Sequence, residues 1–355
     1  MKLSLRRFSG STNLGGSGAK NAQRAWPSRS GLLVELRAGS SRGLGEASPL
    51  PGYSPDTLAE AETALGSLDV SALERAVDVE DIGEALKSVA DLLPRGQPAA
   101  RMALETAALD LRGQQRGVSA PALLGADPGD ARALAWLVDA PSTLMLEAVR
   151  RAQRAGYGHF KIKMGGAGHL ETELAGVREL RQAIGAGPRL RLDANQAWSE
   201  AQAAAACSML EALDIEFIEE PCSRLARRLP TRIPVALDES LQDLDPADLR
   251  ALSLTSGAGV VVLKPMVLGG LSRCLELGRR ARALNLGVVV SHSFDGPVAL
   301  AAAAALALAL PAGIAQGLAP HAGLTAWPPI PLPIVGAKLH AWSGAGLGPA
   351  AELFE

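Results

Sequence analysis

The sequence predicts a closed, parallel α/β barrel of the TIM type that follows a smaller mixed region. From about Ala133 onward, short apolar stretches alternate with helical ones, which is typical of a parallel sheet covered by helices. Seven such stretches in one run favour a closed barrel over an open doubly wound sheet. In chain order they are ALAWLV, HFKIKM, RLRLDA, IEFIEE, PVALDE, GVVVLKP and LGVVVSHS, and a weaker eighth strand is expected near GIAQGLA.

The first part of the chain mixes expected strands and helices. LSLRRF and GLLVELR predict strands, and SPDTLAEAETAL and PAARMALETAALDLRGQQRG predict helices, the second ending at Gly117 as a C-cap. The polar, glycine-rich stretch Ser11–Ser30 predicts a mobile loop, because it lacks the Gly-Lys-Ser/Thr ending of a phosphate-binding loop. We expect a first domain over 1–125, a barrel over 126–321, and a tail, 322–355, that packs back on the first domain.

Composition narrows the classes of protein to consider. The 355 residues are 48% hydrophobic and 20% charged, which indicates a globular protein. A net charge of -2 argues against nucleic acid or an anionic membrane as the main partner. The longest apolar run, PVALAAAAALALALPAG, is too short to span a membrane and predicts a buried helix. The three cysteines show neither metal spacing nor a disulfide pattern, so we expect a cytoplasmic location.

Acidic residues end three consecutive expected strands. Asp193, Glu219 and Asp238 follow apolar runs, and buried carboxylates are costly unless they are paired or bind a metal. The carboxyl ends of barrel strands share one face, where active sites lie, so these acids are expected to converge on one arc. Three hard oxygen donors suit a divalent cation, Mg²⁺ best.

Lysines end the strands on either side of this arc. Lys163 ends the second expected strand and Lys264 the sixth, and these two positions face each other in an eight-stranded ring. The arrangement suits abstraction of a proton beside a carboxylate, with the charge of the resulting enediolate stabilised by the metal. We expect nearby positive charge and partial burial to lower the pKa of the lysine that acts as base. The alternative is that the lysines merely neutralise the acids.

Several motifs carry a resemblance to a known family. KIKMG, RLDANQAW, FIEEPC, VALDESL and VVLKPMVLGGL resemble the barrel motifs of the enolase superfamily. GLGEASPLPGYSPDTL and MALETAALDLRGQ are similar to the capping domain of its muconate-lactonizing branch. Together the motifs resemble those of the o-succinylbenzoate synthases. The resemblance implies a (β/α)7β barrel with an α+β capping domain, and a lyase that uses Mg²⁺, with Mn²⁺ as a substitute, on a small carboxylate substrate of menaquinone biosynthesis.

The resemblance also implies roles for single residues. Lys163 is the implied base, Lys264 the opposing lysine, and Lys161 supports Lys163 electrostatically. The implied metal ligands are the three acids of the arc. Five residues are implied to bind substrate or support the ligands: Asn195, Glu220, Glu239, Ser291 and Ser293. SHSFDG departs from the family pattern at His292, where a small residue is expected.

Two other functions remain open from the sequence. An N-acylamino acid racemase or dipeptide epimerase uses the same metal and lysines, although FIEEPC and VALDESL favour the synthase. A non-catalytic binding protein that has kept the barrel is the second, and the complete set of acids and lysines argues against it. The remaining histidines, Trp198 and Cys222 are expected to pack or to lie at the surface.

Overall fold

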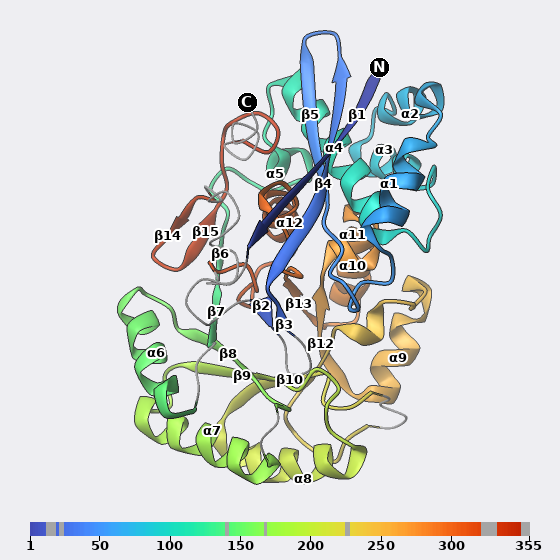
Figure 1. The fold of residues 1–355 in the computed structure, drawn as a ribbon. Helices are drawn as coiled ribbons and strands as arrows, with labels where there is room; N and C mark the ends of the chain where they lie inside the picture. Colours follow the sequence, from blue (N-terminus) through green and yellow to red (C-terminus); the bar gives the residue numbers. More distant parts are fainter. Residues whose placement is uncertain are drawn as a thin grey trace.

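We describe a computed structural model of the chain, in which residues 1–11, 19–20, 25–138, 142–166, 169–223, 228–320 and 332–348 are placed. Figure 1 shows a region of sheet and helices, with the N-terminus, lying against a barrel of parallel strands. The expected fold class, a TIM-type barrel with an additional α+β region, is confirmed.

The barrel strands follow one another in space as they do in the chain. They form a parallel sheet in the order β7 to β13. The first seven expected strands are present: β7 (Ala135–Val138), β8 (His159–Lys163), β9 (Arg189–Asp193), β10 (Ile215–Glu219), β11 (Val235–Leu237), β12 (Ala258–Leu263) and β13 (Gly287–Val290). Their apolar runs are buried because helices cover the outer face of the sheet.

Helices connect most of these strands. They are α6 (Ser142–Arg154), α7 (Leu170–Ile184), α8 (Glu200–Leu210), α9 (Leu249–Ser256), α10 (Pro265–Leu268), α11 (Leu271–Ala283) and α12 (Pro297–Ala309). Short 3-10 turns lie at Glu211–Leu213, Glu239–Leu241 and Pro246–Asp248. Helix α8 begins with a capping box, in which Ser199 and Gln202 each accept a hydrogen bond from the other's backbone N–H.

The eighth position of the ring is filled by bridges instead of a strand. Gln316 pairs in parallel with Leu134, beside β7, and Gly317 pairs with Ser291, just after β13. Ala135 N donates to Gln316 O at 2.9 Å, and Gly317 N donates to Val290 O at 2.9 Å. The ring therefore closes at GIAQGLA with fewer backbone pairs than a regular strand would supply.

The first part of the chain forms a three-stranded antiparallel sheet in the order β1 (Lys2–Ser11), β4 (Ser28–Ala38), β5 (Ser41–Ala47). Its helices are α1 (Leu58–Gly66), α2 (Val70–Val77), α3 (Ile82–Ala90), α4 (Pro98–Arg116) and α5 (Ala120–Leu123). Helix α4 ends at Gly117, whose φ of 66° confirms the expected C-cap. Glycine at position 45 lets β5 approach α4, since a Cβ there would lie 1.9 Å from Ala103 O.

The stretch Ser11–Ser30, predicted as a loop, contains strand residues at both ends and a short strand pair between them. Strand β1 continues to Ser11, β4 begins at Ser28, and β2 (Ala19–Lys20) pairs with β3 (Ala25–Trp26) between them. Residues 12–18 and 21–24, and with them the predicted mobility of the loop, lie outside the described residues.

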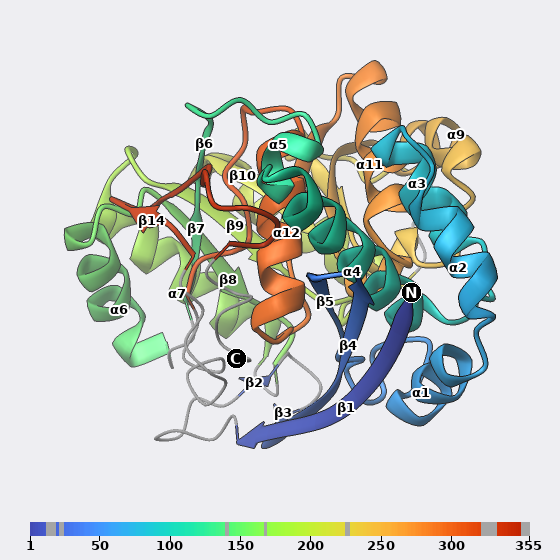
Figure 2. The same cartoon turned by 90° about the horizontal axis from the view of Figure 1, so that it is seen from above.

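Helix α12 and part of the tail join the two regions. The helix is buried almost throughout and lies beside α4 in both ribbon views (Figure 2), which confirms the buried helix expected here. In the tail, β14 (Ile334–Val335) pairs with β15 (Lys338–His340), which pairs with β6 (Ala131–Ala133). Leu347 N donates to Asp110 Oδ1 of α4 at 2.8 Å. These contacts tie the tail both to β6 and to α4. The division into domains at 1–125, 126–321 and 322–355 stays a prediction.

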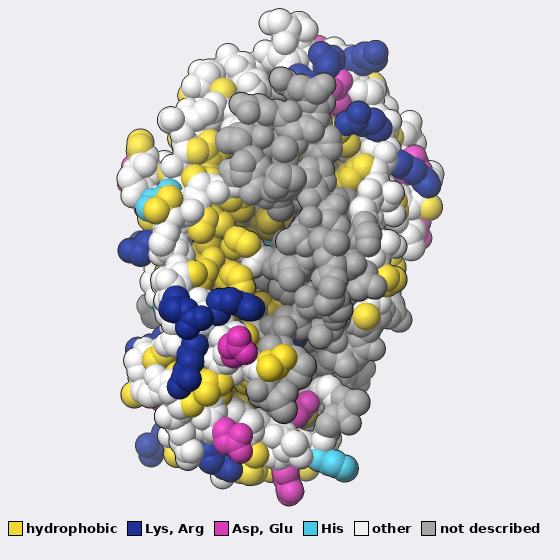
Figure 3. All heavy atoms as spheres, turned by 60° about the vertical axis from the view of Figure 1, so that its left-hand side comes forward, with side chains coloured by type: hydrophobic (Ala, Val, Ile, Leu, Met, Phe, Trp, Pro, Cys, Tyr) yellow, Lys and Arg dark blue, Asp and Glu magenta, His cyan; other side chains and the backbone are white. Residues whose placement is uncertain are grey.

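Among the described residues, no helix combines the length and apolar character needed to cross a bilayer. Cys207, Cys222 and Cys274 are buried and free, as expected. On the face that Figure 3 shows, Lys and Arg side chains gather at the lower left and along the upper right edge, and Asp and Glu side chains lie near both groups.

Candidate active site

The structure brings the acids and lysines of the strand ends to one place. Lys161 and Lys163 lie on β8, Asp193 ends β9 and Glu219 ends β10. Two more follow the next strands directly: Asp238 after β11 and Lys264 after β12. Side chains of alternate residues point to the same face of a strand, so Lys161 and Lys163 both point into the barrel.

Lys161 bridges two of the acids. Its Nζ lies 2.7 Å from both carboxylate oxygens of Glu219 and 2.9 Å from Asp193 Oδ2. Burial opposes the charge of Lys161, but the negative charges of Asp193 and Glu219 raise its pKa above the usual value. The ammonium group of Lys161 is therefore a cation held between the acids that end β9 and β10.

Lys163 is held less tightly and is more exposed. Its Nζ donates to Asp193 Oδ2 at 2.9 Å and to Asn195 Oδ1 at 3.0 Å, and its side chain is 27% exposed. Asn195 is fixed in turn, because its backbone N–H donates to Asp193 Oδ1 at 3.0 Å and its amide to Glu239 Oε1 at 3.3 Å. Asn195, which follows β9, therefore helps to orient the ammonium group of Lys163.

Lys264 approaches from the opposite side of the ring. It forms an ion pair with Asp238 Oδ2 and donates to the phenolic oxygen of Tyr53 at 2.7 Å. Burial would lower the pKa of Lys264, but Asp238 and Glu239 raise it above the usual value. For Lys161 and Lys264, the negative charge of the acids outweighs burial, and both side chains are held as cations.

Glu220 organises the backbone beside the site. It accepts hydrogen bonds from the N–H groups of Asp238 at 2.8 Å and Ser240 at 2.7 Å, and from Gln196 Nε2 at 3.0 Å. These bonds fix the direction in which Asp238 leaves β11. Glu220 thus holds the chain around the cluster, in the supporting place that the sequence suggests for it.

Whether a divalent cation fits depends on the donors and on their charge. Among the described residues, no three His, Cys, Asp or Glu side chains are gathered as ready metal ligands, because lysines lie between the acids. The donor chemistry nevertheless fits a hard cation. The strand ends bring together three lysines and five acids, Asp193, Glu219, Glu220, Asp238 and Glu239, so the cluster carries two more negative than positive charges when all of these groups are ionised.

Two properties of the acids are consistent with an excess of negative charge in the cluster. Burial and the charge of Asp193 raise the pKa of Glu219 to about 7. Oε2 of Glu239 is buried and has no hydrogen-bond partner within the described part of the chain. A bound divalent cation would balance both.

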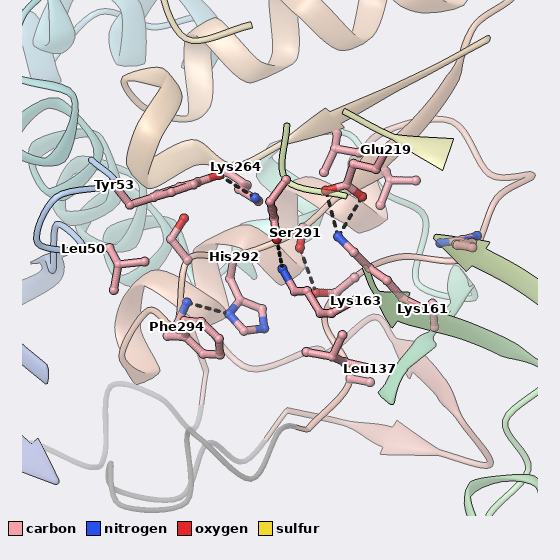
Figure 4. A pocket seen from close by; sticks show the side chains of 18 of the residues that line it. Leu50, Tyr53, Leu137, Lys161, Lys163, Glu219, Lys264, Ser291, His292 and Phe294 are labelled. Carbon is pink, nitrogen blue, oxygen red and sulfur yellow. Dashed lines mark hydrogen bonds and ion pairs between the residues drawn. The ribbon is translucent and has the colours of Figure 1, made fainter. Parts of the chain in front are cut away.

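A pocket opens beside the two lysines (Figure 4) and measures about 860 Å³ including its mouth. Lys163 and Lys264 reach into it, and Leu50, Tyr53, His292 and Phe294 lie on one side. Ser291 and Ser293, expected to bind substrate, line the pocket, and the hydroxyl of Ser293 is buried with no hydrogen-bond partner among the residues described. His292 Nδ1 accepts from Phe294 N at 3.1 Å, so this departure from the family pattern braces the loop.

The sequence does not single out the residues of the first region that line this pocket. Trp26, Leu50 and Tyr53 line it together with Phe294 from the barrel. The tyrosine lies in LPGYSP, within a motif that carries the resemblance, but the sequence gives no sign that its hydroxyl reaches Lys264. Burial and the charge of Asp238 raise the pKa of Tyr53 well above its usual value, so the phenol is neutral.

Comparison with known proteins places the chain in a family. The profile described as "Enolase C-terminal domain-like" matches residues 144–350, more than half of the chain, and "MenC, N-terminal domain" matches 18–90. An o-succinylbenzoate synthase of Yersinia pseudotuberculosis is 31% identical over 321 residues, 87% of this chain and 89% of that protein.

Other relatives have related activities. Muconate cycloisomerase 1 of Pseudomonas putida is 29% identical over 222 residues, 60% of this chain, and the chain spans only 58% of that relative. The solved dipeptide epimerase of Methylococcus capsulatus, complexed with Mg and the dipeptide L-Arg-D-Lys, is 25% identical with a TM-score of 0.79, and covers 98% of both chains. The chain therefore belongs to the enolase superfamily.

Proposed function

We propose that the protein is an o-succinylbenzoate synthase. It is a lyase that removes water from 2-succinyl-6-hydroxy-2,4-cyclohexadiene-1-carboxylate and gives o-succinylbenzoate for menaquinone biosynthesis. The observation that carries the proposal is the placement of Lys163 and Lys264 on opposite sides of one pocket, beside a cluster with more acids than lysines. The relative that matches 87% of the chain and bears this name supports it.

The proposed metal ligands are Asp193, Glu219 and Asp238. Their carboxylates are buried and suit Mg²⁺, or Mn²⁺ in its place, and a solved relative contains Mg. When bound, the ion supplies a Lewis acid that stabilises the charge which develops on the substrate carboxylate. Lys161 balances Asp193 and Glu219, and Glu220 holds the backbone of Asp238 in place.

Lys163 is the proposed base and acid of the elimination. Its neutral amine removes the proton alpha to the ring carboxylate, and the C–H electron pair moves into an enediolate. The electron pair then returns to form the ring double bond as the C–O bond to the hydroxyl breaks. Lys163 gives its proton to the departing oxygen, so water leaves and the amine is neutral again. One residue suffices when both groups leave from the same face.

Lys264 has a different role in this reaction. Its ion pair with Asp238 and its hydrogen bond to Tyr53 hold a charged ammonium group on the opposite face. A fixed cation there steadies the enediolate without moving a proton. Ser291 and Ser293, at the end of β13, are the proposed contacts for the rest of the substrate.

The second candidate is an N-acylamino acid racemase or dipeptide epimerase, which the presence of two lysines in one pocket favours. Such an enzyme needs both lysines as acid and base in turn. The tight pairing of Lys264 beside the looser contacts of Lys163 supports the synthase instead.

The test is an assay of the purified protein with Mg²⁺ on two substrates. The cyclohexadiene substrate is followed by aromatic absorbance and N-succinyl amino acids by optical rotation. We expect efficient dehydration. Efficient racemization with negligible dehydration would establish the second candidate instead. No turnover of either substrate, together with no Mg²⁺ binding by calorimetry, would indicate a non-catalytic binding protein.

A further inference from the structure

Several charged side chains of the first region are buried outside the acid and lysine cluster, and two of them bond the loop that lines the pocket. Arg29, on β4, and Glu46, on β5, are 1% and 0% exposed. Buried charges are costly unless hydrogen bonds satisfy them, so their partners indicate what they hold in place. Some of those partners lie in the Ser48–Pro49 segment, and the others lie in the barrel, in the loop Ser291–Gly296 between β13 and α12 and in the first turn of α12.

Arg29 links both sides of this contact. Its Nε donates to Phe294 O at 3.1 Å and its Nη2 to Ser293 O at 3.4 Å. The same guanidinium donates to Pro49 O at 2.9 Å and to Ser48 O. A planar guanidinium presents its donors in a fixed fork, so Arg29 sets the distance between the Ser48–Pro49 backbone and the loop.

Glu46 holds the other end of the loop. Its Oε1 accepts from Gly296 N at 2.6 Å, and its Oε2 accepts from Val298 N at 3.1 Å and Ala299 N at 3.2 Å. The N–H groups at the start of a helix have no acceptor within the helix, and Glu46 supplies one at the start of α12. A carboxylate at this position stabilises the helix. No space remains for another atom, since a Cβ on Gly296 would lie 2.5 Å from Glu46 Oε1.

The barrel holds the start of the loop through backbone contacts. Ser291 is tied to the barrel through Leu263 O at 2.9 Å and the Gly317 backbone. Beyond it, Phe294 has φ of 54°, in the left-handed region that bulky residues avoid. Such a backbone persists only where its surroundings hold it, and Arg29 bonds the carbonyl of this residue.

The loop also forms a wall of the substrate pocket. Ser291, His292, Ser293 and Phe294 all line it, and the Phe294 ring lies 6.2 Å from that of Trp26, centroid to centroid. A shift of the loop would change the shape of the pocket but would leave Lys163 and the acids of β9 and β10 in place. Such a shift is expected to alter substrate binding more than proton transfer.

We propose that Arg29 and Glu46 are positioning residues that clamp the Ser291–Gly296 loop and so set how the substrate is bound. This inference rests on the proposed function for its substrate. Neither side chain lines the pocket. Each acts on it through hydrogen bonds to the backbone of the loop.

The experiment combines hydrogen exchange with kinetics on Arg29→Met and Glu46→Gln. The matched controls are Arg37→Met and Glu35→Gln, which remove a partly exposed ion pair from the same strand as Arg29. In both clamp variants we expect faster amide exchange over 291–299 without substrate. We expect KM for the cyclohexadiene substrate to rise about tenfold, the effect of one charge-assisted hydrogen bond, with kcat changed less than about threefold. The controls should change neither.

Two further variants keep the test decisive if Arg29→Met folds poorly. Arg29→Lys keeps the charge but loses the fork, so its KM should rise less and in the same direction. Gly296→Ala disturbs the Glu46 contact from the barrel side and should reproduce the Glu46→Gln result. Unchanged exchange over 291–299, or a loosened loop with unchanged KM, would overturn the clamp. So would exchange that rises evenly over the whole chain while KM and kcat stay intact. If the wild-type protein does not dehydrate the substrate, the proposed function fails, and the exchange measurement still decides whether the clamp exists.

Discussion

The phenolic oxygen of Tyr53 lies 2.7 Å from Nζ of Lys264 and donates to Asp238 Oδ2 at 3.2 Å. Tyr53 belongs to the segment between β5 and α1, whereas its two partners follow strands of the barrel. The first region therefore supplies one polar atom to the cluster that the barrel builds. Because the phenol is neutral, it can accept from the lysine and donate to the carboxylate at the same time.

Replacement of Tyr53 by Phe should weaken catalysis without unfolding the protein. The ring remains, but Lys264 loses one acceptor and Asp238 one donor. We expect kcat/KM to fall about tenfold, the effect of one hydrogen bond to a charged group. Steady-state assays check this. The control is Tyr157→Phe, because the second tyrosine of the chain packs on Trp136, away from the pocket lining. Equal losses in both variants would count against the role of Tyr53.

Removal of one proposed ligand should abolish activity and leave the fold intact. Asp193→Asn, Glu219→Gln and Asp238→Asn each remove a charge that a divalent cation requires. We expect kcat to fall at least about a hundredfold, with weaker Mg²⁺ binding in calorimetry and an unchanged circular dichroism spectrum. Asp214→Asn, an exposed change far from the strand ends that carry the cluster, is the control. Near-normal turnover of Asp238→Asn with excess chelator would show that the metal assignment is wrong.

The sequence predicts the barrel and the convergence of its acids for a physical reason. Apolar runs such as RLRLDA stop at an acid, and parallel strands place their ends on one face, so local patterns suffice for β8 to β13. Tyr53 could not be predicted in the same way, because its contact with Lys264 joins residues 211 positions apart. The pairing of Lys161 with Glu219 also escapes the sequence, since either a lysine or a metal can balance a buried acid.

The stability of the protein should depend on pH partly through Glu105. This acid of α4 is buried against the start of α11, where it accepts from Ser272 N and Oγ at 2.7 Å each. Burial raises its pKa to about 7, above the ordinary value near 4.5. The folded state therefore holds the proton more tightly than the unfolded state. Its contribution to stability is fully present below about pH 4.5 and is lost as the pH rises through 7.

The variant Glu105→Gln removes this titration and keeps the shape of the side chain. We expect the midpoint of thermal unfolding of the wild type to fall between pH 5 and pH 7.5, and to fall less in the variant. Glu62→Gln, a change at a partly exposed acid of α1 that pairs with Arg7, should retain the wild-type slope. A variant whose pH profile is parallel to that of the wild type would show that Glu105 is ionised throughout this range.

The two lysines should respond differently to substitution if the protein is a synthase. Lys163 moves the proton, so Lys163→Arg, which keeps the charge but cannot serve as a base, should lose dehydration by at least about a thousandfold, in the range of a lost general acid–base group. Lys264 supplies only charge in the proposed reaction, so Lys264→Arg should retain measurable dehydration while Lys264→Ala should not. Rates of product formation, with circular dichroism to verify folding, check both. A racemase would lose activity equally in Lys163→Arg and Lys264→Arg, because each lysine then acts in turn as acid and base. Loss of dehydration in Lys264→Arg to the level of Lys163→Arg would therefore contradict a purely electrostatic role, and would mean that Lys264 also transfers a proton from its place between Tyr53 and Asp238.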